Sequence, residues 1–151
     1  MEPHSRQVSV DGLLGTLADF RFELRRFLQF SESAATEAGL HPQQHQLLLQ
    51  VAGAGEGIAV TIACVAARLG LKHNSTVELV DRSMQEGLLT RNADSSDRRR
   101  TILRVTRIGR QVLRRLSGEH ARELTVRGPR LVKALQRIGQ HAEYAPPVVI
   151  E

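Results

Sequence analysis

The spacing of apolar residues predicts a chain made mostly of helices. Residues 11 to about 38 carry apolar side chains at steps of three and four, which is the period of one helix face. The members of this stripe are Leu13, Leu17, Phe20, Leu24 and Phe27, and Gly39 closes the helix. At roughly 1.5 Å per residue the helix is about 40 Å long. Its wide apolar surface could be buried either by a partner subunit or by the chain's own C-terminal helices.

Shorter periodic segments follow. His41–Ala52 is predicted to be a helix with Pro42 near its first position, where a missing N–H has no cost. A second helix is predicted from Thr61, a good N-cap, to Leu69, and Gly70 is suited to a left-handed C-terminal stop. A third is predicted over about His73–Glu86. Its inward face is Thr76, Leu79, Val80 and Ser83.

The next segment changes to the period of strands. Leu88–Arg91 and Thr101–Val105 are predicted to form a hairpin around the polar, basic loop 92–100. Two short helices joined by a glycine turn and followed by a basic hairpin are typical of a winged helix-turn-helix unit. In that unit the second helix enters the major groove of DNA.

The C-terminal third is predicted to hold two helices. Thr106 is a suitable N-cap for a helix to about Val126, Gly128–Pro129 breaks the pattern, and a last helix covers Pro129–Glu143. The apolar side of the first of these helices is predicted to be Ile108, Val112, Leu116 and Leu124. Met1–Val10 is polar and expected to be frayed, and the prolines after Ala145 exclude a helix there.

A longer stretch resembles a known family. It reads LGLKHNSTVELVDRSMQEGLLTRNADSSDRRRTILRVTRIGR and is similar to the MarR family of winged-helix transcription regulators. The match follows the order of a turn ending in LGL, a helix with STV-x-L-V-D-R, then GLL-x-R, then a wing D-x-x-D-R-R that closes on L-x-V-T-x-x-G. The chain departs from the family's pattern at Glu78, where a basic or neutral residue is usual, and at Ser83, where leucine is usual.

The resemblance implies a mainly α (α+β) fold. The whole chain, 1–151, is expected to be a single MarR-like domain, with dimerisation helices at 11–40 and 106–143 and a DNA-binding lobe at 41–105. In the family the terminal helices of two copies intertwine. A two-fold dimer of this kind places two recognition helices in successive major grooves, about 34–36 Å apart.

The charge distribution favours a polyanionic partner. The formal net charge is +5, and nine arginines lie between Arg91 and Arg115 against Asp94 and Asp97. Double-stranded DNA with a pseudo-palindromic operator is the expected partner, and a solvated basic face is the alternative. No apolar run or signal-peptide pattern predicts a membrane or secretory segment, and the single cysteine fits a cytoplasmic protein.

The residues expected to contact DNA lie at the start of the recognition helix and in the wing. Asn74 can pair with adenine, and Val77 can touch a thymine methyl group. Asp94 and Asp97 are expected to brace arginines and fix the hairpin. Internal salt bridges of Arg82 or Arg99 with Asp81 or Asp97 are the alternative. The full predicted set is His73, Asn74, Ser75, Val77, Arg82, Arg98 and Arg99.

The resemblance also implies a small anionic aromatic effector that releases DNA. Arginines of the first helix could meet its carboxylate, and histidines of the second could add hydrogen bonds. The alternative is surface arginines and solvated histidines. The predicted effector residues are Phe20, Arg21, Leu24, Arg25, His41 and His45.

Nothing in the sequence predicts an enzyme, a cofactor or a catalytic residue, since phosphate loops, nucleophile elbows and closed metal-ligand strings do not occur. His41 and His45, four residues apart, could share a metal, but two ordinary polar histidines are the simpler interpretation, and no metal site is expected. Cys64 is interpreted as an inert thiol. The predicted function is a homodimeric, sequence-specific transcriptional repressor. The alternatives are a non-specific architectural DNA-binding protein and a winged-helix protein-interaction module.

Overall fold

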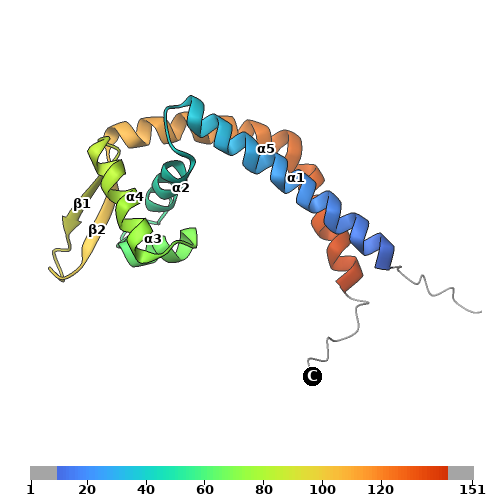
Figure 1. Cartoon of the computed structure of the whole chain (residues 1–151), viewed down its shortest axis with the longest axis horizontal. Helices are drawn as coiled ribbons and strands as arrows, with labels where there is room; N and C mark the ends of the chain where they lie inside the picture. The colour runs from blue at the N-terminus through green and yellow to red at the C-terminus, as the bar shows by residue number, and fades with distance from the viewer. Residues whose placement is uncertain (1–9, 143–151) are drawn as a thin grey trace, which may run out of the picture. The chain divides into compact units, whose positions relative to one another are not determined.

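The computed structural model describes residues 10–142 (Figure 1). Predictions for residues 1–9, for Glu143 and for the tail from Ala145 lie outside this range. The chain divides into two compact units: Met1–Phe30 with Ala121–Glu151, and Ser31–His120. The second unit therefore contains the predicted lobe 41–105 together with residues 31–40 and 106–120. Among the helices that the structure describes, none combines the length and apolar composition needed to cross a membrane.

The unit Ser31–His120 holds the winged helix-turn-helix (Figure 1). Its complete elements are α2 (Pro42–Ala52), α3 (Ile62–Leu69), α4 (His73–Gln85), β1 (Leu89–Ala93) and β2 (Thr101–Val105). The end of α1 (Val10–Glu37) and the start of α5 (Arg107–Ala142) complete it. Over residues 10–142, five helices and one two-stranded antiparallel sheet confirm the predicted mainly α fold with a wing.

Local residues begin and end the helices as the sequence indicates. The Thr61 hydroxyl accepts a hydrogen bond from the Cys64 amide, 3.2 Å away, and so caps α3. Gly70 ends α3 with a φ of 65°, a left-handed conformation that favours glycine. His41 precedes α2 and forms a capping box with Gln44, whose side chain accepts from the His41 amide. These caps confirm the predicted helix boundaries to within a residue.

The hairpin is tied to the rest of this unit through buried strand residues. Leu89 lies opposite Val105 and Arg91 lies opposite Leu103 in the antiparallel ladder. The Leu103 amide donates to the Val60 carbonyl at 2.9 Å, so the segment before α3 runs beside β2. The first strand begins one residue later than predicted. The largest apolar side chains that are fully buried in the unit are Leu47, Leu48, Val65, Val80, Leu103 and Leu116.

The first turn of α5 packs against the hairpin at a glycine. The Thr106 hydroxyl accepts from the Gly109 amide at 3.1 Å, which confirms Thr106 as an N-cap, and it donates to the Gly87 carbonyl. A Cβ on Gly109 would lie 2.4 Å from the Leu88 carbonyl oxygen. The buried face of this turn is therefore centred on Gly109, and the prediction that Ile108 points inward is wrong, since its side chain is 57% exposed.

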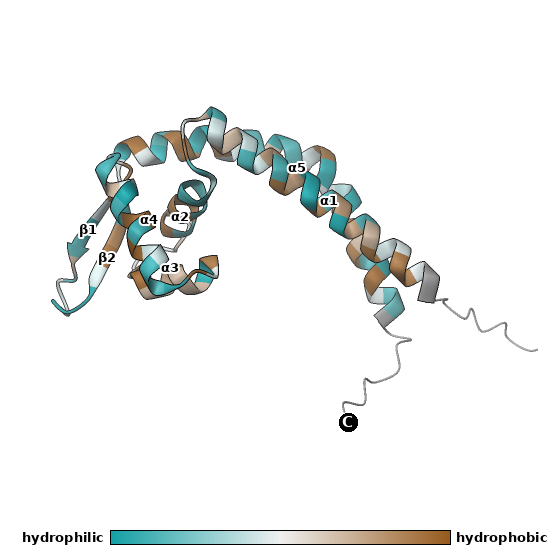
Figure 2. Ribbon diagram, in the orientation of Figure 1, coloured by the Kyte–Doolittle hydropathy of each residue, from teal (hydrophilic) through white to brown (hydrophobic). Residues whose placement is uncertain are grey.

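The unit of residues 10–30 and 121–142 contains parts of α1 and α5 joined by ion pairs. Glu23 is buried, and its carboxylate lies 3.7 Å from the Arg127 guanidinium and 3.6 Å from that of Arg130. Glu123 also contacts Arg127. Figure 2 shows hydrophobic residues along both helices.

The predicted break at Gly128–Pro129 is wrong, because α5 is one continuous helix with Pro129 inside it. Proline removes one backbone donor and destabilises a helix interior by about 3 kcal/mol. Ion pairs lie on both sides of the proline, because Glu23 of α1 contacts Arg127 before it and Arg130 after it. The chain pattern alone contains no sign of this contact between distant segments.

Candidate nucleic-acid interface

Helix α4 buries one face and exposes the other. Thr76, Leu79, Val80 and Ser83 are buried, as predicted. At the start of the opposite face, the exposed residues are His73, Asn74, Ser75 and Glu78. Val77 on the same face is half-buried. The inward face anchors α4 against α2, α3 and β1, so the outward face is held in a fixed orientation.

The N-terminus of α4 has backbone N–H groups that no side chain caps. Lys72 is the N-cap residue, and its side chain makes no capping hydrogen bond. Its carbonyl accepts from both the amide and the hydroxyl of Thr76, each at 3.0 Å. Uncapped N–H groups and the positive end of the helix dipole favour an anion such as a phosphate group.

Ser83 shows how a polar residue fits the buried face of α4. Its side chain is fully buried, and its hydroxyl donates to the Leu79 carbonyl at 2.8 Å. The Ser83 carbonyl in turn accepts from the Leu88 amide at 2.9 Å. The serine that replaces the family's usual leucine is therefore internally hydrogen-bonded.

An ion pair that the sequence did not predict links α4 to the wing. Asp81 lies 3.6 Å from Arg91 of β1, so the expected alternative of an Asp81–Arg82 pair is not what the structure shows. Arg82 is exposed. Both members of the observed pair are partly exposed, so it contributes orientation more than stability. Arg91 belongs to the GLL-x-R motif, whereas its partner Asp81 lies in the preceding helix, outside that motif.

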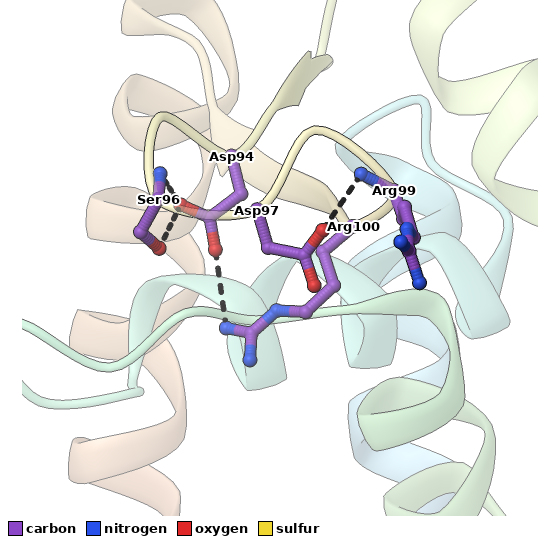
Figure 3. A network of polar contacts seen from close by, with 5 residues as sticks. All are labelled: Asp94, Ser96, Asp97, Arg99 and Arg100. Carbon is purple, nitrogen blue, oxygen red and sulfur yellow. Dashed lines mark hydrogen bonds and ion pairs between the residues drawn. The ribbon is translucent and has the colours of Figure 1, made fainter.

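Asp94 organises the wing loop (Figure 3). Its buried carboxylate accepts from the amide and hydroxyl of Ser96 at 3.0 and 2.9 Å, and it lies 3.2 Å from the Arg100 guanidinium. These contacts confirm the prediction that Asp94 braces an arginine. The Ser96 amide, then the Ser96 hydroxyl, and more weakly Arg100, lower the pKa of the Asp94 carboxyl against the opposing effect of its burial.

Asp97 fixes the backbone instead of a guanidinium. Its carboxylate accepts from the Arg99 amide at 3.0 Å, and in Figure 3 the Arg99 side chain points away from it. The expected Asp97–Arg99 side-chain salt bridge is therefore not formed. Arg98 and Arg99 are exposed, and no ion pair within the described part of the chain holds either guanidinium. The two aspartates thus shape a loop that presents two arginines to solvent.

The six residues predicted for an effector are divided between the units. Phe20, Arg21, Leu24 and Arg25 belong to the first unit, where Phe20 is half-buried and the other three are exposed. His41 and His45 belong to the second, where the His41 ring caps α2 by accepting from the Gln43 amide.

His45 is not the solvated histidine of the alternative interpretation. Its side chain is 2% exposed, and its ring lies 5.0 Å from that of His120. His120 in turn contacts the Ser31 hydroxyl and the Leu116 carbonyl. Burial first, and the neighbouring His120 second, lower the pKa of His45, so its ring is neutral near pH 7. Across the described residues no group of three potential metal ligands occurs. Cys64 is an exposed free thiol on α3.

Comparison with known proteins gives one family. Residues 38–100 match the model of the MarR family. A relative from Thauera aromatica, whose name describes a transcriptional regulatory protein for the hcr operon, is 32% identical over 108 residues, which is 68% of this chain. The chain spans 63% of the length of that relative.

Solved structures with the same fold include one with DNA and one with a ligand. A mutant of S. aureus MepR bound to an oligodeoxyribonucleotide has a TM-score of 0.62 at 15% identity, over 83% of this chain and 91% of that one. The PcaV transcriptional regulator from Streptomyces coelicolor, in complex with its natural ligand, has a TM-score of 0.55 at 25% identity, over 79% and 90%. Both confirm the winged-helix architecture.

Proposed function

The chain belongs to the MarR family through residues 38–100, and from that premise we propose that it is a homodimeric, sequence-specific DNA-binding regulator of transcription that acts as a repressor. The name of the Thauera relative and the oligodeoxyribonucleotide bound to MepR support this proposal.

The observation that carries the proposal is the pairing of an anchored helix with an arginine-presenting wing. The N-terminal face of α4 is exposed, polar and uncapped, while four residues of its other face are buried. Asn74 would read adenine, Ser75 a base or a phosphate, and Val77 a thymine methyl group. His73 would lie at the same groove edge, Arg82 would meet phosphate, and Arg98 or Arg99 would enter the minor groove.

The exposed apolar side chains of the first unit support a dimer. In a monomer these large side chains remain in contact with water, which is unfavourable. A second copy of the same helices would cover them and would set two α4 helices at the spacing of successive major grooves. The exposed apolar side chains of this unit are Leu14, Leu17, Phe22, Leu24, Leu28, Leu124, Val126, Val132 and Leu135. Because a second copy would cover them, sedimentation at micromolar concentration should show a dimer.

Substitutions in α4 test base reading. Asn74→Ala and Ser75→Ala should each weaken binding to a selected site by on the order of 1–3 kcal/mol, and weaken binding to random DNA far less. Gln85→Ala, an exposed polar change at the far end of α4, is the matched control and should leave both affinities unchanged. Equal losses on both DNAs would mean that these residues only position the backbone.

The alternative functions give different results in the same titrations. An architectural protein would bind selected and random DNA equally and lose both as salt rises. A protein-interaction module would bind neither DNA. The proposed repressor binds its site above background at a salt concentration where random DNA is released.

Release by a small anionic effector is the regulatory part of the proposal. The ligand bound to PcaV supports it for the fold. The effector residues stay a prediction: replacing Arg21 and Arg25 by glutamine should make the protein–operator complex resistant to millimolar salicylate. The coupling is reciprocal, since a ligand that weakens DNA binding is itself bound more weakly by the DNA complex. Release that persists in this variant would contradict the assignment of the two arginines.

A further inference from the structure

An open cavity lies inside the unit Ser31–His120. It has a volume of about 860 Å³, within the range of about 300–1,000 Å³ that small-molecule sites occupy. Its walls are the end of α2, the glycine-containing loop 54–60, strand β2, the base of the wing and the first turn of α5. All these segments belong to one compact unit, so the cavity is defined by a single packing arrangement.

Three arginines line this cavity against two acidic groups. Arg100 and Asp94 form the ion pair shown in Figure 3, and the Asp94 carboxylate is also satisfied by Ser96. That pair is close to neutral as a unit. Arg104 and Arg110 remain, both exposed, against the exposed carboxylate of Glu56. The charge facing the cavity is thus positive overall.

The same cavity exposes apolar surface beside these cations. Ile58 is 61% exposed, and Ile102 is half-buried on β2. Exposed apolar surface in a concave site is stabilised when a ligand removes it from water. A guanidinium group adjacent to such surface prefers a carboxylate, sulfonate or phosphate, with which it forms charge-assisted hydrogen bonds.

We propose that this cavity binds a small organic anion. Its apolar body covers Ile58 and Ile102, and its anionic group pairs with Arg104 and Arg110. The lining of this site includes none of the residues predicted for the effector.

A pair of fluorescent probes tests the proposal on the full chain without DNA. Anilinonaphthalene sulfonate carries the required anion, and phenylnaphthylamine has the same aromatic body without charge. The variant Arg104→Gln with Arg110→Gln should bind the sulfonate at least about tenfold more weakly, because neither glutamine can form a charge-assisted hydrogen bond with it. Its affinity for the neutral probe should be unchanged. Ile58→Asp should weaken the binding of both probes.

Two controls separate this cavity from other surfaces. Arg26→Gln with Arg122→Gln removes the same charge from exposed positions of the first unit that belong to neither proposed site, and should leave both affinities unchanged. Arg104→Lys with Arg110→Lys should retain most of the sulfonate affinity, and thermal unfolding checks that every variant is folded. Unchanged sulfonate binding in the folded Arg104→Gln/Arg110→Gln variant would overturn the proposal, as would an equal loss in the Arg26/Arg122 control. Because no DNA is present, neither result depends on the proposed function.

Discussion

At the residue scale, Gly109 lies where α5 packs against the hairpin with no room for a side chain. A Cβ at this position would lie 2.4 Å from the Leu88 carbonyl oxygen and 2.7 Å from a Val105 methyl group. Gly109→Ala should therefore lower the free energy of unfolding by roughly 1–3 kcal/mol, as overpacking of a filled core does. Chemical denaturation measures the change.

The matched control is a glycine of the same helix with open space around it. A Cβ on Gly139 has nothing within 4 Å, so Gly139→Ala should raise the free energy of unfolding by up to about 1 kcal/mol through helix propensity. Equal effects of the two substitutions would mean that the contact at Gly109 does not set the packing of α5.

At the element scale, the wing should contribute affinity without sequence preference. Arg98→Ala and Arg99→Ala remove exposed guanidinium groups that the Asp94 and Asp97 contacts leave facing solvent. The double variant should bind all DNA sequences more weakly. The log–log slope of affinity against salt should also flatten by about 0.9 for each phosphate that the variant no longer neutralises.

Arg122→Ala controls for the change in overall charge, because this arginine is exposed on α5 in the other unit. Its affinity and salt slope should match the unmodified protein. A double wing variant with the affinity and slope of the Arg122→Ala control would show that the wing is not a DNA element.

Elements governed by local residues were predictable from the sequence. The caps Thr61 and Thr106, the stop at Gly70 and the four buried positions of α4 follow from short-range hydrogen bonds and the 3.6-residue period. The brace at Asp94 was also predictable, because its partners lie within six residues.

Features that depend on distant segments were not predictable. Glu23 of α1 contacts arginines on both sides of Pro129, and His45 is buried beside His120 of a helix that begins some sixty residues later. The Asp81–Arg91 pair joins a helix to a strand. A periodic pattern identifies a face but not the segment that covers it.

At the scale of the whole molecule, α1 illustrates the same limit and indicates a partner. Leu17 and Leu24 of its predicted stripe are 38% and 36% exposed, whereas Thr16 and Glu23 are buried. Within the described residues the chain therefore covers a different face of α1 from the one that the apolar pattern marks. The proposed dimer accounts for the marked face, because a second copy would cover it.

Sequence-specific binding by a dimer is tested by selection of binding sites from random double-stranded DNA at physiological salt, followed by footprinting and affinity measurement. We expect an inverted repeat with half-site centres one helical turn apart, about 10 base pairs, protected by two chains. We also expect an affinity at least about 10³-fold above that for a scrambled sequence at the same salt. Selected pools without a shared sequence, or equal affinity for the selected and scrambled DNA, would contradict it.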